Sequence, residues 1–175
     1  LAHKVLIQNS KASVANLTVI AGDIQHSHFS KAMKKIMALP AGGLNDYVAP
    51  LLAAWTSIAQ GGTIKNSLAH LEPLKQEGSK PLYFLHKALV LDFKGDLEEA
   101  ERAYLEGIEE QGTLVLRVAQ LLGNLYERRG NFTKARALYK QFAQDNPNSH
   151  FHHQAMRFLA AGVGTEPIIR TAKHG

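Results

Sequence analysis

Apolar and small residues recur along this chain at intervals of about 34 positions. Small residues stand at Ala32, Ser67, Ala100 and Ala135, which are separated by 35, 33 and 35 positions. The third residue before each of them is apolar, and so is the fourth residue after each: Phe29, Ile64, Leu97 and Phe132 before, and Ile36, Leu71, Tyr104 and Tyr139 after. These spacings place the side chains on one face of a helix, so the pattern predicts repeated helical hairpins.

Turn and cap residues set the expected bounds of these helices. First helices are predicted at residues 13–26, 46–60 and 82–93, with Asn45 or Asp46 as a cap, and second helices at 29–39, 64–76 and 97–110. In the second repeat the register is open by one residue. With Gly62 as its turn, bulky Trp55 takes the place that Gly123 has in the fourth repeat, and the paired helices are expected to lie farther apart there.

The clearest repeat runs from Leu116 to Ser149. It contains Leu122, Gly123, Tyr126, Gly130, Ala135, Tyr139 and Pro147. This spacing resembles the tetratricopeptide (TPR) helix-turn-helix repeat. Of the residues typical of that repeat, only the leading Trp is missing here, and Ala119 stands in its place. The first repeat departs from the pattern at its turn, where Ser27 stands in place of Gly.

The resemblance implies an all-α fold, an α-α superhelix of about four helical hairpins with partial helices at both ends. The repeat domain is expected over residues 1–161, followed by a tail at 162–175. Within the domain, residues 1–8 form a partial helix, the repeats cover 13–44, 46–79, 81–113 and 116–149, and a further helix covers 149–161. Because one hairpin cannot bury its faces alone, stability is expected to come from stacking.

The resemblance also implies a binding groove, because the first helices of such a stack line its concave wall. The expected wall residues that form the candidate site are Leu52, Thr56, Leu82, Leu85, Leu89, Phe93, Arg117, Gln120, Asn124 and Arg128. The wall is apolar through the first three repeats and polar or basic in the fourth. This favours a partner peptide or helix that is apolar along its length, with Arg117, Asn124 and Arg128 holding a polar or acidic end. The alternative is that these leucines pack between neighbouring helices or under other parts of the protein.

The function we expect is therefore a protein-protein interaction scaffold or adaptor, with a protein or peptide partner of unknown identity. Two alternatives stay open: a structural module that self-associates as a homo-oligomer, and the non-catalytic part of a larger envelope enzyme or assembly. The chain begins at Leu1 inside an expected helix, so we interpret it as a piece of a longer protein. It is similar to long bacterial TPR proteins, which leaves the bacterial cytoplasm and the periplasm as compartments.

Composition changes this picture little. The chain has 175 residues, 45% apolar residues and a net charge of +5, and its basic residues are interspersed with acidic ones. Nucleic-acid binding needs basic residues gathered on one face, so we expect none. No apolar run reaches the roughly 18 residues that span a bilayer, so no membrane insertion is expected. The absence of cysteine excludes disulfides and thiolate chemistry.

Candidate chemistry is sparse. The chain contains no Gly-rich phosphate loop, no nucleophile elbow and no His-Glu-x-x-His motif. His86 and Asp92 lie on one expected helix but six positions apart, where they share a face poorly. On a helix, His150 and His153 are three positions apart and could share a metal, and His26 and His28 form a second pair in a turn. No cysteine accompanies them and no carboxylate has ligand spacing, so we interpret them as polar residues of a helix start and a loop. We expect no enzymatic activity, no cofactor and no metal.

Overall fold

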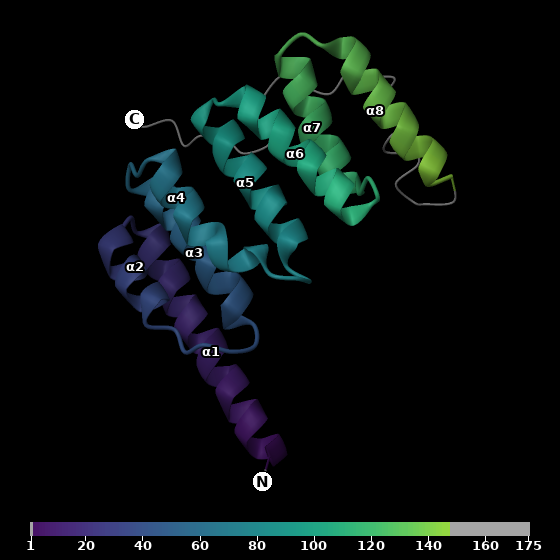
Figure 1. The fold of residues 1–175 in the computed structure, drawn as a ribbon. Coiled ribbons are helices and arrows are strands. Elements are labelled where there is room, and N and C mark those ends of the chain that lie inside the picture. Colours follow the sequence, from purple (N-terminus) through teal and green to yellow (C-terminus); the bar gives the residue numbers. More distant parts are fainter. Residues whose placement is uncertain (1, 148–175) are drawn as a thin grey trace. The chain divides into compact units, whose positions relative to one another are not determined.

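The part of the chain that the structure describes is entirely helical. The computed structural model describes residues 2–147, with side chains from residue 14 onward. Within that range there are eight α-helices, one short 3-10 helix and no strand (Figure 1). The bounds are α1 Ala2–Gln25, α2 Phe29–Met37, α3 Asn45–Ala59, α4 Ile64–Leu71, η1 Glu72–Lys75, α5 Lys80–Lys94, α6 Leu97–Gln111, α7 Leu116–Arg128 and α8 Phe132–Asp145. The all-α class is confirmed.

The expected element bounds fail in three places. The helix expected at residues 1–8 is not separate, because α1 runs unbroken from Ala2 to Gln25. Neither Asn45 nor Asp46 caps α3, whose N-cap is Leu44 without a side-chain bond. Pro73 lies in η1, so α4 ends at Leu71 instead of continuing to Gln76. The helix expected at 149–161 and the tail at 162–175 lie outside the described residues.

The chain forms two compact units, residues 1–79 and residues 80–175, and we describe each by itself. In unit 1, α2 packs against α1 and α3, α3 also packs against α4, and η1 contacts α3 and α4. In unit 2, α5 packs against α6, α6 against α7, and α7 against α8. Within each unit, each α-helix thus packs against the next one along the chain, which is how helical hairpins close with short connections.

One turn geometry occurs in all four hairpins. Ser27, Gly61, Gly95 and Gly130 follow the first helices and have φ values of 59°, 88°, 84° and 72°. The amide of the next residue in each case donates to the carbonyl five positions back, over 2.7–3.0 Å. This is the Schellman ending of a helix, which requires a left-handed residue and therefore favours Gly. Ser27 adopts the same conformation, so its departure from Gly does not change the turn.

The turn residues also settle the register of the second repeat. Seven positions before them stand Ile20, Ala54, Ala88 and Gly123, and all four are buried. Ala54 rather than Trp55 therefore takes the place of Gly123, so the reason for expecting a wider spacing there does not hold. The one-residue ambiguity in register arises because this hairpin has an additional residue, Gly62, between the turn residue Gly61 and the N-cap Thr63. A Cβ at Gly62 would lie 2.5 Å from the Ser57 carbonyl oxygen, so only Gly fits.

The second helices supply the other side of each hairpin. The small residues Ala32, Ser67, Ala100 and Ala135 are at most 2% exposed, as are Ile36, Leu71, Tyr104 and Tyr139 four positions later. In the last hairpin a Cβ at Gly123 would overlap the ring of Tyr139. The large ring and the absent side chain therefore fit each other, which explains why a residue that disfavours helix occurs within α7.

Candidate interaction surface

The predicted wall of unit 2 comes from α5 and α7. Leu85 of α5 and Arg117 of α7 line one small cavity of about 50 Å³, together with Tyr104 and Val118. Arg117 is exposed, whereas Leu82, Leu85 and Gln120 are partly buried. The structure thus brings residues from two predicted repeats to one place, and the open part of the wall lies near the start of each helix.

The polar end of the predicted stripe is engaged internally. The two Nη2 contacts of Arg128 to Asp92 are 2.6 Å and 2.7 Å long, and Arg128 Nε donates to Asn124 Oδ1 at 2.9 Å. The side chains of Arg128 and Asp92 are 13% and 12% exposed, and Asn124 is 2% exposed. The expectation that Arg128 and Asn124 hold a partner's polar end meets a physical obstacle, because an ion pair already joins α5 to α7 there.

The rest of this wall is covered as well. Seven consecutive residues of α7, Leu121 to Glu127, are buried, which is nearly two helical turns and therefore includes every face. On α5, Leu89 is 6% exposed, and Phe93 is partly buried. The middle of α7 is therefore buried on every face. The sequence pattern assigns one face of this helix to solvent, because the pattern contains no information on the helices that pack against it.

The two candidate residues of unit 1 belong to its interior. Leu52 packs against the core cluster of Ile20, Ala32, Ile36 and Ala53. Thr56 is 1% exposed, and its hydroxyl has no hydrogen-bond partner among the described residues. Leu52 therefore contributes to the packing of unit 1, and Thr56 is closed to a partner.

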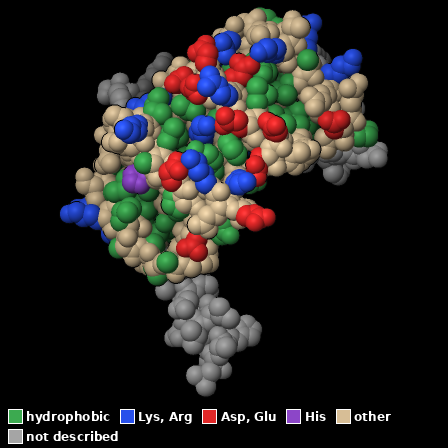
Figure 2. Space-filling model, viewed as in Figure 1, with side chains coloured by type: hydrophobic (Ala, Val, Ile, Leu, Met, Phe, Trp, Pro, Cys, Tyr) green, Lys and Arg blue, Asp and Glu red, His purple; other side chains and the backbone are tan. Residues whose placement is uncertain are grey.

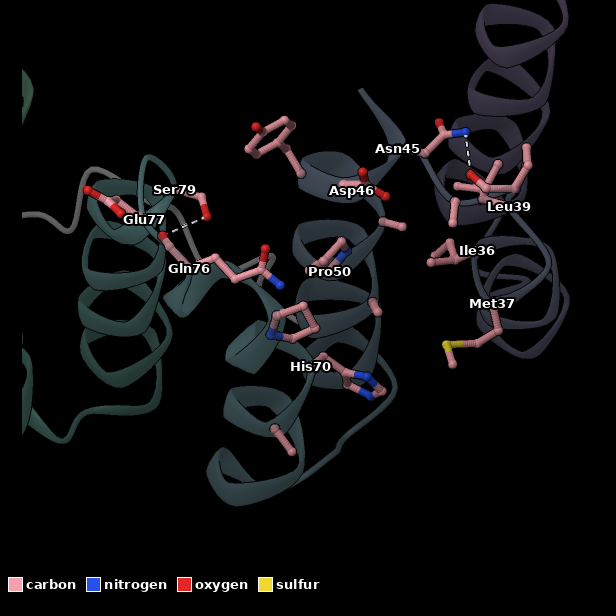
Figure 3. Close-up of a pocket in the computed structure, with 17 residues that line it drawn as sticks. Ile36, Met37, Leu39, Asn45, Asp46, Pro50, His70, Gln76, Glu77 and Ser79 are labelled. Atoms are coloured by element: carbon pink, nitrogen blue, oxygen red, sulfur yellow. Dashed lines mark hydrogen bonds between the residues drawn. The ribbon is translucent and has the colours of Figure 1, made fainter. Parts of the chain in front are cut away.

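Unit 1 has instead a larger cavity that sequence reasoning missed. Its volume is about 590 Å³, and it lies along the first half of α3, between the end of α2 and the α4–η1 segment (Figure 3). Its lining consists of Ile36, Met37, Leu39, Pro40, Ala41, Asn45, Asp46, Tyr47, Ala49, Pro50, Ala53, Ala69, His70, Pro73, Gln76, Glu77 and Ser79. None of the ten predicted wall residues lines this cavity.

The polar groups of this cavity are arranged by the loop before α3. Asn45 Nδ2 donates to the Pro40 carbonyl at 2.9 Å, and Asp46 Oδ1 accepts from the Gly42 amide at 2.8 Å. These two bonds tie the glycine-containing loop to the helix start, which is why neither side chain caps α3. Asn45 and Asp46, the residues expected to cap a helix, thus form part of the cavity wall. This role depends on the conformation of the loop before α3, which the sequence pattern does not predict.

Charged side chains in unit 2 form mixed clusters. Arg129 contacts Glu101 at 2.7 Å and Glu98 at 2.9 Å, and Lys134 contacts Glu101 at 2.7 Å. Figure 2 shows basic and acidic side chains interspersed on the face that it presents. Glu98 therefore pairs with Arg129, whereas Arg102 contacts Glu99 at 3.0 Å.

Burial is the main cause of the pKa shifts of Tyr104 and His86 in unit 2. Burial raises the pKa of Tyr104 well above its usual range, and the nearby Asp92 carboxylate adds to this rise. Burial lowers the pKa of His86.

No group of three or more His, Cys, Asp or Glu that could hold a metal occurs among residues 14–147. His26 and His28 stack at 6.1 Å between ring centroids, a contact within a turn.

The comparisons add no relative. No protein-family model, no curated protein and no solved structure matches this chain. Within the described residues, no helix is both long and apolar enough to cross a bilayer.

Proposed function

We propose that this chain is a non-catalytic protein-interaction module built from tetratricopeptide-like repeats. The observation that supports the repeat architecture is the recurring turn at Ser27, Gly61, Gly95 and Gly130, each with a buried residue seven positions earlier. The turns are 34, 34 and 35 residues apart. A motif with constant length, backbone conformation and packing position is what tandem hairpins of this type require.

The docking surface that we favour is the open start of the wall in unit 2. Arg117 is exposed, makes no hydrogen bond or ion pair among the described residues, and lies beside Leu85 at a shared cavity. An apolar surface with an adjacent unpaired guanidinium suits a peptide that carries an apolar residue followed by a carboxylate. Leu82 and Gln120 extend this surface.

The experiment is a charge reversal with photo-crosslinking in cells of the source organism. A photoreactive residue at position 120 is expected to crosslink to a discrete partner, and Arg117→Glu is expected to abolish this product. Arg136→Glu is the matched control, because Arg136 is an exposed residue of α8 with the same charge. If both reversals leave the product unchanged, this surface does not bind the partner.

Self-association is the second candidate function. The exposed apolar side chains Val115, Leu105 and Phe132 of unit 2 are the observation that keeps it open. Light scattering that shows a constant monomer mass over a hundredfold range of concentration would exclude it.

A further inference from the structure

The cavity of unit 1 combines an apolar floor with groups that accept hydrogen bonds. Ile36, Leu39, Ala49 and Ala53 are buried or partly buried and form apolar lining. In Figure 3, Ile36 and Met37 from α2 face Pro50 and His70 across the opening. A volume of about 590 Å³ lies within the range of sites that take a small ligand or a few residues of a peptide.

Two side-chain oxygens of the cavity lining, on Asp46 and Asn45, accept no hydrogen bond within the described residues. Asp46 Oδ1 takes one bond from the Gly42 amide, and no contact to its second oxygen occurs within the described residues. Asn45 is 5% exposed, and its Oδ1 has no partner in the described part of the chain. Figure 3 shows the Gln76 side chain directed toward Pro50, whereas the Glu77 carboxylate lies on the outer side, away from Asp46. Asp46 is therefore the charged acceptor of the cavity.

The charge of the lining differs from that of the chain. The chain carries a net charge of +5, yet the cavity has two carboxylates and neither Lys nor Arg in its lining. A cationic occupant is therefore favoured over an anionic one. Among cationic side chains, Arg suits an apolar site with one carboxylate and nearby amide oxygens, since its guanidinium donates five hydrogens and its stem is apolar.

Exposed apolar side chains at the mouth of the cavity would contact the residues on either side of that cation. Met37 is 68% exposed and Tyr47 is 45% exposed, and both line the cavity, while Leu44, three positions before Tyr47, is 59% exposed. Large apolar side chains that gather at the mouth of a cavity commonly mark a docking site. They offer contacts to apolar residues on either side of an inserted side chain.

From these observations we propose that the cavity binds a peptide segment in which an arginine is flanked by apolar residues. The guanidinium binds Asp46 Oδ2, and its stem lies on the apolar floor that includes Ile36 and Ala49. The site involves unit 1 alone. It is distinct from the surface around Arg117, so either site can fail experimentally without the other.

The test is fluorescence anisotropy with two labelled peptides, Gly-Leu-Arg-Leu-Gly and the same sequence with citrulline in place of arginine. Citrulline keeps the shape and loses the charge. The arginine peptide is expected to bind at least about fivefold more tightly to the full chain, as one partly exposed ion pair permits. Asp46→Asn is expected to remove this difference, and it keeps an Oδ1 acceptor for the Gly42 amide, so the loop before α3 is retained.

Two further variants separate the cavity from general effects. Ala69→Trp places a large ring in the cavity from an exposed position of α4 and is expected to weaken both peptides. Glu72→Gln is the matched control, because Glu72 is an exposed carboxylate of unit 1 outside the lining, and its effect is expected to stay within about twofold.

The outcomes that overturn the proposal are specific. Equal affinity for the two peptides would mean that the cavity selects only apolar groups, and unchanged binding by Asp46→Asn would place the cation elsewhere. No binding of either peptide at millimolar concentration would also exclude it. If light scattering shows dimers that Ala69→Trp disrupts, the occupant is a second copy of this chain rather than an arginine peptide.

Discussion

At the scale of single residues, Ser27 shows how a backbone requirement is met by an unfavourable side chain. It has φ of 59°, and it is the one non-Gly residue with positive φ in the described part of the chain. The corresponding residues in the other turns are Gly61, Gly95 and Gly130. A non-Gly residue in the left-handed region costs about 1 kcal/mol, so the first hairpin holds a small strain that the other three lack.

Replacing Ser27 by Gly is expected to stabilise unit 1. The relieved strain exceeds the added entropy of the unfolded chain, which leaves a gain of about 0.5–1 kcal/mol. Urea unfolding followed by the fluorescence of Trp55 measures this, because the chain has a single Trp and it lies in unit 1. The reverse change Gly95→Ser in unit 2, followed by far-UV circular dichroism because Trp55 reports on unit 1, is the control and is expected to cost a similar amount. A lower urea midpoint for Ser27→Gly would show that the hydroxyl makes a stabilising contact.

At the scale of elements, the hairpins were readable from the sequence because their determinants are local. The apolar positions at Ala100 and Tyr104, and the turn at Gly95, act within one helical pair. The register of α3 was not readable, because two adjacent glycines can each supply the turn and only the close approach of Gly62 to Ser57 decides between them. Local patterns define a helical pair but leave a one-residue ambiguity wherever two residues satisfy the same turn.

The candidate wall was harder to predict, for a different reason. Periodicity divides α7 into a core face and an opposite face, and it assigns Asn124 and Arg128 to the latter. In the structure Asp92 of α5 pairs with Arg128, and Asn124 is buried beside it. Whether a polar stripe faces solvent or a polar partner depends on a contact 36 residues away, which no local pattern contains.

The ion pair between α5 and α7 is expected to be sensitive to removal of one partner. Arg128→Met leaves the Asp92 carboxylate partly buried without its counterion and is expected to cost about 3 kcal/mol in the free energy of unfolding. The double variant with Asp92→Leu removes both charges and is expected to be more stable than Arg128→Met alone. Urea unfolding of the two proteins at neutral pH, followed by far-UV circular dichroism, measures the difference. Equal destabilisation by the single and double variants would show that the guanidinium contributes packing rather than charge.

At the scale of the whole molecule, the two units differ in how their stability depends on pH. The tyrosines with a raised pKa, Tyr104, Tyr126 and Tyr139, all belong to unit 2. Burial is the main cause for each, and for Tyr126 the neighbouring Glu101 carboxylate adds to it and raises the pKa to about 12. An unfolded tyrosine has a pKa near 10. Between about pH 10 and 12 the folded unit therefore retains protons that the unfolded chain releases.

This difference in bound protons determines the sign of the effect. The free energy of unfolding falls with rising pH wherever the folded state binds more protons, so the contribution is complete below pH 10 and is lost as pH rises through 12. Unit 2 is therefore expected to unfold at lower urea concentrations as the pH is raised from 8 to 11. Far-UV circular dichroism, which reports on both units, should show an early transition that moves more than the one reported by Trp55.

Tyr126→Phe separates tyrosine ionisation from other alkaline effects. Phe keeps the ring beneath Lys134, whose Nζ lies 5.2 Å from the ring centroid, and removes the ionisable hydroxyl. The variant is expected to shift less between pH 8 and 11 than the unchanged protein, while the Trp55 transition stays the same in both. Any loss of ion pairs such as Lys134–Glu101 at alkaline pH acts on both proteins alike. If the pH dependence of unit 2 is identical with and without the Tyr126 hydroxyl, ion-pair loss rather than tyrosine burial makes this unit sensitive to alkali.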